Sequence, residues 1–321
     1  MFAGNHQQCD YISGTFPGIE TIYLEGYNVR YAASGSMFMP AILQQIPSLL
    51  HTIRRENAWL KETIEHYKID MVISDNRYGL YHKKVPSVII THQLNIITGF
   101  GSIADDMLRR LHYRFLNRFN NVWVVDMPGA PGLAGQLSHP KQLPDNTQYI
   151  GLLSQVEIKE TTGEKYLLVL LSGPEPQRTL LADKLWQQVL LYNGKIIFVE
   201  GSDEVAAKQD IPPHITYHKR LSGDALAAAI SGADMVICRS GYSTLMDLVK
   251  LNKKAILIPT PGQTEQEYLA KHLAGKGNFT YVAQHKINLL NDLDNTSYSP
   301  FAMSQDNFKL FIQVVDEWLN K

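Results

Sequence analysis

Residues 238–244, with the sequence CRSGYST, join a short apolar run to a helical pattern. The free backbone N–H groups and the positive end of a helix that begins there can hold an anion, and Gly241 lets a phosphate approach closely. Ser243 and Thr244 can cap the helix or donate to phosphate oxygens. Asp247, one turn further on, shares that face and can accept hydrogen bonds from two ribose hydroxyls. The alternative is structural, with Ser243 as a helix cap and Asp247 as a favourable charge near a helix start.

Two further polar loops follow apolar runs in this half of the chain. Residues 258–262 end one run in a rigid loop with two prolines, and residues 263–268 then open a helix. The other loop spans residues 172–178 and ends at Arg178, which can reach a diphosphate. Because the carboxyl ends of parallel strands meet at one edge of a sheet, three polar loops there predict a ligand-binding cleft.

The elements that must position these loops alternate regularly in the second half of the chain. Short apolar strands separated by helices are typical of a parallel sheet covered on both faces, so we expect a Rossmann-like doubly wound α/β domain. The expected strands are 166–171, 195–200, 215–218, 235–238, 255–259 and 279–283, and the expected helices are 179–191, 224–231 and 243–251.

The first half shows the same alternation less regularly. The expected strands are 19–24, 70–74, 87–91 and 121–125, and the expected helices are 104–117 and 38–67, the latter interrupted near Pro40 and Pro47. Residues 128–144 are rich in Pro, Gly and polar side chains and have no periodicity, which is typical of a linker. We therefore place a domain boundary near Ile150, with domains 1–150 and 151–321.

The composition excludes several classes of protein. The 321 residues are 45% apolar and 19% charged, which suffices for two buried cores. A net charge of −1 gives no general electrostatic basis for binding nucleic acid. The two cysteines form neither a disulfide framework nor a zinc site. Since the sequence has no 18-residue apolar run and no signal-peptide pattern, we expect a cytoplasmic protein.

Residues 233–273 resemble the donor-binding segment of GT-B glycosyltransferases of family 28. The resemblance implies two Rossmann-like domains that face a cleft, and inverting transfer of a sugar from a UDP-sugar. Because the helix end at Gly241 and Arg178 or Arg239 would stabilise the departing diphosphate, we expect no metal ion or other cofactor. The sequence departs from the family pattern at two places. Asp247 replaces the usual Glu, and Gln266-Glu267 replaces a Gln pair. The donor contacts that the resemblance implies are Gly173, Arg178, Arg239, Ser240, Gly241, Ser243, Thr244, Asp247, Gln266 and Glu267.

The acceptor side has a weaker counterpart, since residues 85–95 resemble the Pro–strand–His segment of the same family. His92 at the end of that strand is a candidate general base for a sugar hydroxyl, or it is satisfied by loop backbone. Asp75 is a second candidate base, or it caps the turn at residues 75–79. The acceptor contacts that the resemblance implies are Asn76, Tyr78, Gln93 and Asn95.

Residues 104–119 interleave apolar side chains with Arg109, Arg110, His112, Arg114 and Arg118. Such a helix can lie on an anionic membrane surface, as in family 28 enzymes with lipid-linked acceptors. That use implies weak peripheral contact with the inner membrane surface. The commoner use of the pattern is a core-facing helix with a solvated outer face.

The amino terminus departs from the family pattern. Residues 1–35 contain no glycine-rich loop with a histidine, and residues 1–5 resemble the end of the second strand of the family's acceptor domain. We therefore expect an amino-terminal domain without the first β–α unit. Two alternatives to a transferase remain open. One is a UDP-sugar hydrolase of the pseudaminic-acid pathway type, whose Asp/Tyr turn resembles residues 75–79, and the other is a non-catalytic sugar-nucleotide-binding protein.

Overall fold

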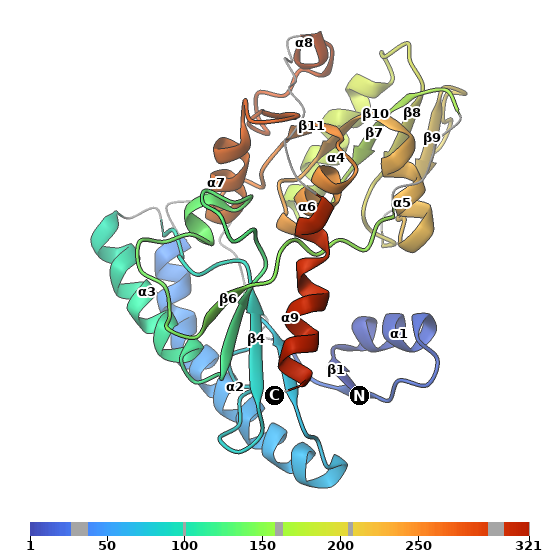
Figure 1. The fold of residues 1–321 in the computed structure, drawn as a ribbon. Helices are drawn as coiled ribbons and strands as arrows, with labels where there is room; N and C mark the ends of the chain where they lie inside the picture. The colour runs from blue at the N-terminus through green and yellow to red at the C-terminus, as the bar shows by residue number, and fades with distance from the viewer. Residues whose placement is uncertain (27–37, 99–100, 158–162, 205–207, 295–304, 321) are drawn as a thin grey trace.

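The computed structural model describes residues 1–26, 38–98, 101–157, 163–204, 208–294 and 305–320. Within them the second half of the chain forms one parallel sheet in the order β12-β11-β10-β7-β8-β9 (Figure 1). The strands are β7 (Tyr166–Leu170), β8 (Ile196–Val199), β9 (Ile215–His218), β10 (Ala233–Cys238), β11 (Lys254–Leu257) and β12 (Phe279–Tyr281).

This strand order confirms the predicted doubly wound fold. Counted from β9, the strands of this half follow the order third, second, first, fourth, fifth and sixth, which is the dinucleotide-binding order. The direction of winding reverses between β7 and β10, so a crevice is expected at the carboxyl ends of these two strands. Their loops are two of the three polar loops predicted from the sequence.

Helices cover both faces of this sheet because each presents one apolar face to it. In α4, Leu181, Leu185 and Val189 recur every four residues and are fully buried. The helices of this half are α4 (Gln177–Val189), α5 (Gly223–Gly232), α6 (Tyr242–Lys250), α7 (Thr264–Leu273) and α8 (Leu289–Asp294).

The first half contains two parallel sheets, a four-stranded one in the order β3-β4-β5-β6 and the pair β1-β2. The strands are β1 (Phe2–Gly4), β2 (Thr21–Tyr23), β3 (Val72–Asp75), β4 (Ser87–Thr91), β5 (Asn121–Val124) and β6 (Thr147–Tyr149). The helical segments are α1 (His6–Thr15), α2 (Phe38–Tyr67), α3 (Ser102–Leu116) and the 3-10 turn η2 (Gly135–Leu137). Among the described residues, no strand joins β1 to β3.

The predicted interruption of the long helix is wrong. Helix α2 is continuous over 30 residues with Pro47 inside it, and Pro40 falls in its first turn, where a missing N–H costs nothing. Pro47 is exposed and removes one intrahelical hydrogen bond. Further along, Leu60 and Ile64 pack against Val72 of β3, and this packing keeps the helix on the sheet.

Residues 128–144, predicted as a linker between the halves, instead connect β5 to β6 within one sheet. The buried carboxylate of Asp126 organises this loop by accepting hydrogen bonds from the N–H groups of Leu133 and Ala134 and from the Ser138 hydroxyl. A polar, non-periodic sequence therefore forms a fixed loop here, because one carboxylate satisfies its backbone.

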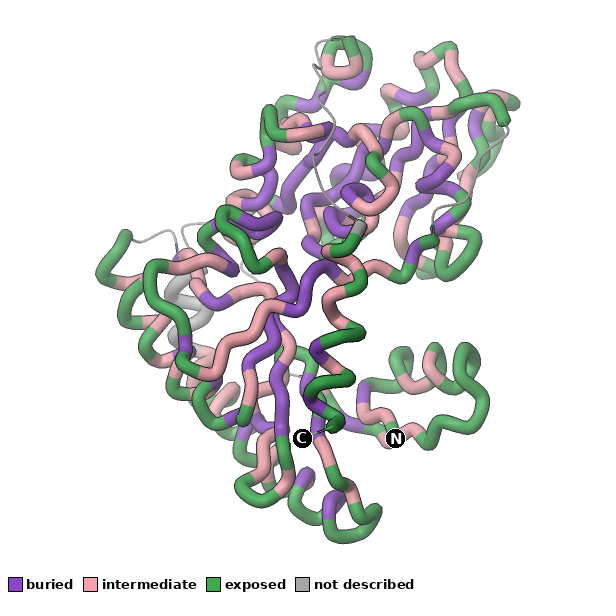
Figure 2. Tube along the Cα trace, in the orientation of Figure 1, coloured by how far each residue is buried: buried purple, intermediate pink, exposed green. Residues whose placement is uncertain are grey.

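The two halves share packing near the boundary predicted at Ile150, which falls between β6 and β7. Helix α9 (Leu310–Leu319) follows the 3-10 turn η3 (Gln305–Phe308) and returns to the first half (Figures 1 and 2). There the buried Trp123 ring meets the Trp318 ring edge-on, with ring centroids 5.4 Å apart. Gly151 has a φ of +77°, and a Cβ there would lie 2.1 Å from the carbonyl oxygen of Asn307.

Four elements of the structure were not predicted from the sequence, namely α1, β6, α8 and α9.

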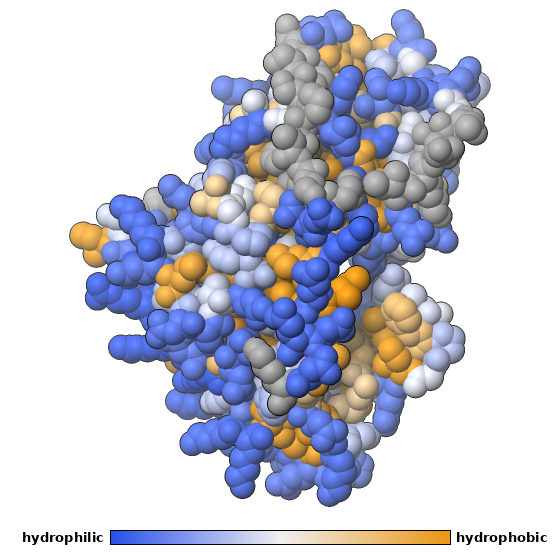
Figure 3. Space-filling model, viewed as in Figure 1, coloured by the Kyte–Doolittle hydropathy of each residue, from blue (hydrophilic) through white to orange (hydrophobic). Residues whose placement is uncertain are grey.

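The β1-α1-β2 unit presents apolar side chains to solvent. Helix α1 buries no residue, and Tyr11, Phe16 and Tyr23 are each about half exposed. Figure 3 shows hydrophobic residues at the surface of this unit, beside α9. The expected strand near residues 1–5 is confirmed as β1.

Candidate active site

The carboxyl end of β10 continues through Gly241 into α6, and this junction is open. Gly241 is the N-cap of α6, no side chain caps the helix, and a Cβ on Gly241 would meet nothing within 4 Å. The N–H groups of the first helical turn have no partner within the helix. Those of Tyr242, Ser243 and Thr244 are therefore available to bind an anion.

Arg239 and Ser240 precede this junction, but their side chains support the loops. Arg239 is 1% exposed and donates to the carbonyl oxygens of Ile258, Pro259 and Gln177. Burial lowers its pKa to about 10. Ser240 is fully buried and donates to a backbone carbonyl of α7. A diphosphate would have to displace these bonds to reach either side chain.

Arg178 is also buried, at 3% exposure. Its guanidinium donates to the Glu200 carbonyl at 3.0 Å and to the Glu175 carboxylate. Burial opposes ionisation of Glu175, but hydrogen bonds from Thr179 and Arg178 outweigh it and lower the pKa of Glu175. The expected contact between Arg178 and a diphosphate thus competes with an existing ion pair.

The loops after β7 and β11 approach each other beside this junction. Gly173 has a φ of +107°, which favours glycine, and its Cβ position lies 3.5 Å from the buried Thr260 hydroxyl. Gln266 accepts a hydrogen bond from the Thr260 N–H, and Glu267 accepts one from the Gly262 N–H. The bond to Gln266 uses its side-chain oxygen, so its NH2 group is the part available to a sugar hydroxyl.

Asp247 lies in the second turn of α6 and faces the segment that connects the halves. Its Oδ1 accepts a hydrogen bond of 2.6 Å from the Ser154 hydroxyl. The pKa of Asp247 is raised above its ordinary value by burial, and the Ser154 bond and the charge of Lys250 offset this only in part. The second carboxylate oxygen is the one that can meet a ribose hydroxyl.

His92, at the carboxyl end of β4, reaches the second half of the chain. Its Nε2 lies 2.9 Å from Glu265 Oε1 in the first turn of α7. Its ring stacks on Tyr242, with centroids 4.4 Å apart and planes 9° apart. Tyr242 in turn donates to the Val125 carbonyl at 2.7 Å. The candidate base therefore lies directly on the first residue of α6.

Asp75, at the end of β3, lies close enough to His92 for their charges to interact. The surrounding protein raises the pKa of Asp75, and the charge of His92 partly offsets this. Asn76 follows in the left-handed region with a φ of +52°. An ion pair between Arg77 and the buried Glu56 of α2 fixes this turn.

The other predicted acceptor residues lie further from the open junction. The Tyr78 hydroxyl lies 3.1 Å from Nε2 of His112 in α3. Burial raises the pKa of Tyr78 to about 12. Gln93 and Asn95 are half-buried in the loop after β4. The Asn95 N–H donates to the Leu137 carbonyl of η2, so this loop is held by the loop that Asp126 organises.

Residues 161–316 match the glycosyltransferase family 28 C-terminal domain. The chain carries a family 28 glycosyltransferase domain. This confirms the resemblance predicted from residues 233–273, and the family 28 domain contains the complete six-stranded sheet.

Relatives of this chain include bacterial proteins that share one name. They are named UDP-N-acetylglucosamine–N-acetylmuramyl-(pentapeptide) pyrophosphoryl-undecaprenol N-acetylglucosamine transferase. The one from Mannheimia succiniciproducens is 28% identical over 76% of this chain and 69% of its own length. The one from Pasteurella multocida is 27% identical over 65% of this chain and 56% of its own length.

Solved structures share the GT-B fold across nearly all of the chain. MurG from Acinetobacter baumannii has a TM-score of 0.53 at 15% identity, over 98% of this chain and 85% of its own. The calicheamicin glycosyltransferase CalG4 has a TM-score of 0.64 at 10% identity, over 99% of this chain and 89% of its own. The predicted pair of Rossmann-like domains is therefore confirmed as a fold.

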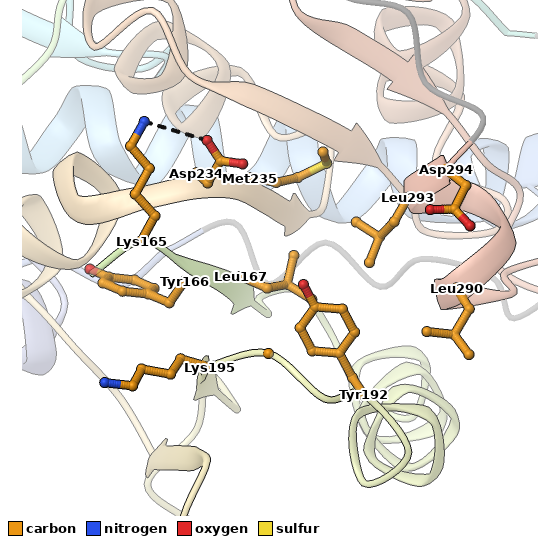
Figure 4. Close-up of a pocket in the computed structure, with 11 residues that line it drawn as sticks. Lys165, Tyr166, Leu167, Tyr192, Lys195, Asp234, Met235, Leu290, Leu293 and Asp294 are labelled. Atoms are coloured by element: carbon orange, nitrogen blue, oxygen red, sulfur yellow. Dashed lines mark ion pairs between the residues drawn. The ribbon is translucent and has the colours of Figure 1, made fainter. Parts of the chain in front are cut away.

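A pocket of about 350 Å³ lies at the opposite edge of the family 28 domain, where β7, β8 and β10 begin (Figure 4). Its two lysines are already paired, Lys165 with Asp234 at 3.6 Å and Lys195 with Glu164. Its place at the amino ends of the strands separates it from the predicted donor loops.

The partners of His92 were not predictable from the sequence. In sequence terms, Tyr242 is only part of the strand–helix junction and Glu265 only part of a polar helix start. Both meet His92 because the two sheets face each other, and 173 residues separate His92 from Glu265 in the sequence. A local pattern carries no information on a contact of this kind.

Proposed function

We propose that the chain transfers a sugar from a UDP-sugar to an acceptor hydroxyl held by the first half, without a metal ion. The observation that supports this most directly is the stacking of His92 on Tyr242. It brings a candidate base next to the open N-terminus of α6, where a diphosphate can be held. The names of the relatives, which describe UDP-N-acetylglucosamine transferases, support a UDP-linked donor.

In the proposed reaction, the acceptor hydroxyl gives its proton to His92. The acceptor oxygen forms a bond to the anomeric carbon while the bond from that carbon to the diphosphate breaks. The electron pair leaves with the diphosphate, whose negative charge the N–H groups of α6 stabilise. Attack on the face opposite the leaving group inverts the anomeric centre. Asp75, whose pKa is raised, is the alternative base.

The acceptor in this proposal is lipid-linked, as the names of the relatives describe for their own acceptors. Helix α3 offers a surface for this. Ile103 and Met107 are 86% and 73% exposed, and Arg110 and Arg114 are exposed on the same face. None of the helices in the described part of the chain combines the length and apolar character that a membrane crossing requires. We propose peripheral contact through α3.

The experiment that tests the donor site is UDP binding by calorimetry. Asp247→Ala should weaken UDP about tenfold, because it removes the proposed ribose acceptor. The same variant should bind 2′,3′-dideoxy-UDP as tightly as the wild type does, since that nucleotide lacks both ribose hydroxyls. Asp234→Ala, at the opposite edge of the sheet, is the matched control and should bind UDP normally. Unchanged UDP affinity in Asp247→Ala would show that the ribose lies elsewhere.

Turnover distinguishes the alternatives to a transferase. Release of free sugar from a UDP-sugar without an acceptor would favour the hydrolase. Binding of UDP without turnover of any donor would favour the non-catalytic protein. Activity in the presence of EDTA is expected, since the proposed leaving-group contacts are backbone N–H groups.

A further inference from the structure

His92 and Glu265 form a hydrogen-bonded pair between elements of the two halves. The pair joins the end of β4 to the first turn of α7 at 2.9 Å, and α7 lies at the border between the two sheets (Figure 1). The side chains of His92 and Glu265 are 26% and 33% exposed, so both remain partly accessible to solvent. A polar pair this exposed contributes little to stability.

The orientation of His92 is fixed in two ways. Stacking on Tyr242 sets the plane of the imidazole ring, and the Tyr242 hydroxyl is itself tied to the Val125 carbonyl. Within that plane, the bond to Glu265 involves Nε2. A carboxylate accepts hydrogen bonds, so a neutral imidazole in this pair carries its proton on Nε2 and its lone pair on Nδ1.

We propose that Glu265 is the positioning residue for His92 in sugar transfer. This inference rests on the proposed function. Glu265 holds the Nε2–H tautomer, and Nδ1 takes the proton of the acceptor hydroxyl while the acceptor oxygen replaces the diphosphate on the anomeric carbon. The imidazolium that forms is balanced by the Glu265 carboxylate. No other group supplies or removes electrons in this step.

The neighbouring carboxylates have other positions or partners. Glu267, also in the first turn of α7, accepts a hydrogen bond from the Gly262 N–H at 3.0 Å. Asp75 interacts with His92 through its charge. Of the three carboxylates, Glu265 is therefore the one whose position can determine the tautomer of His92.

The test is the tautomer of His92, read from the ¹⁵N shifts of its ring at about pH 8, where a free imidazole is neutral. The full-length protein should show the Nε2–H form. Glu265→Ala should shift His92 towards a mixture of the two tautomers. Glu265→Asp should restore part of the Nε2–H form, and Glu265→Gln, which keeps an acceptor oxygen, should retain it. An unchanged tautomer in Glu265→Ala would overturn the proposal.

Kinetic measurements distinguish the positioning of His92 by Glu265 from the negative charge of Glu265. Glu265→Gln should lower kcat roughly tenfold and Glu265→Ala roughly a hundredfold, with the KM for the UDP-sugar nearly unchanged. Glu317→Gln, an exposed carboxylate on α9, is the control and should leave both constants unchanged. An equal kcat in Glu265→Ala and the wild type would also overturn the proposal.

Failure of the proposed function gives a different result. In that case His92→Ala would leave turnover unchanged, or no UDP-sugar would be consumed by the wild type. The tautomer would still depend on Glu265, because that dependence comes from the hydrogen bond alone. The two failures are therefore distinguishable.

Discussion

Arg239 illustrates how one residue type can serve a ligand or the fold. A cation beside a predicted phosphate site indicates a phosphate contact, yet Arg239 donates to carbonyls at three places and to the Gln284 side chain at 2.8 Å. Five donors in a planar fork suit this task, since one guanidinium can join loops that a lysine could not. The sequence indicates that a cation is present, but the packing determines which groups the Arg239 guanidinium contacts.

Arg239→Ala should therefore lower the free energy of unfolding by about 2–4 kcal/mol, because it leaves buried carbonyls without donors. Urea denaturation measures this. The Ser243→Ala variant, at an exposed position of the α6 N-terminus, should change stability by less than about 1 kcal/mol. If Arg239→Ala kept full stability but lost UDP binding, the guanidinium would be a ligand contact after all.

At the scale of elements, α3 has two different faces. Its inner face carries His112, which is 4% exposed and lies between the Tyr78 hydroxyl and the Leu94 carbonyl. This buried histidine was predicted from the sequence as part of a basic surface, and the structure removes it from that surface. The outer face keeps Ile103 and Met107 beside exposed arginines.

The inner face predicts a pH dependence of stability. Burial lowers the pKa of His112 to about 4 in the folded state, whereas the unfolded chain has the ordinary value near 6.5. The unfolded state therefore binds a proton first as the pH falls from about 6.5 to about 4. The free energy of unfolding should drop by about 3 kcal/mol across this range. His112→Gln should show a flatter profile, measured by urea denaturation at each pH, and parallel profiles would contradict this.

The outer face predicts binding to anionic vesicles. Replacing Ile103 and Met107 together by Ser should weaken sedimentation with phosphatidylglycerol vesicles about tenfold or more, because two apolar side chains no longer enter the bilayer. Leu180→Ser on α4, where Leu180 is 54% exposed, is the matched control. Equal sedimentation of both variants would mean that α3 does not meet the membrane.

Periodic elements were predictable from the sequence, and irregular ones were not. The strands and helices of the family 28 domain follow from apolar runs that end at glycine or proline. Helix α2 was predicted with breaks because Pro47 opposes helices locally, and packing on β3 outweighs that preference. The loop at residues 128–144 was predicted as a linker because nothing in its own composition reveals Asp126.

At the scale of the whole molecule, contacts between the halves decide how the site is assembled. The bond from Tyr242 to Val125 and the pair formed by His92 and Glu265 cross between the two sheets. Helix α9 adds a third crossing at Trp123. The donor loops were predictable because each follows its own strand. The partners of His92 were not, since they depend on how two distant sheets face each other.

These contacts give the central claim a direct test, which is amide and imidazole mapping by NMR during titration with UDP. We predict saturable shifts in the N–H signals of residues 241–244 and in the ring of His92, which stacks on Tyr242. We predict no change at Lys165 or Tyr192, which line the pocket at the other edge. Shifts confined to that pocket, or no saturable shift at residues 241–244, would contradict it.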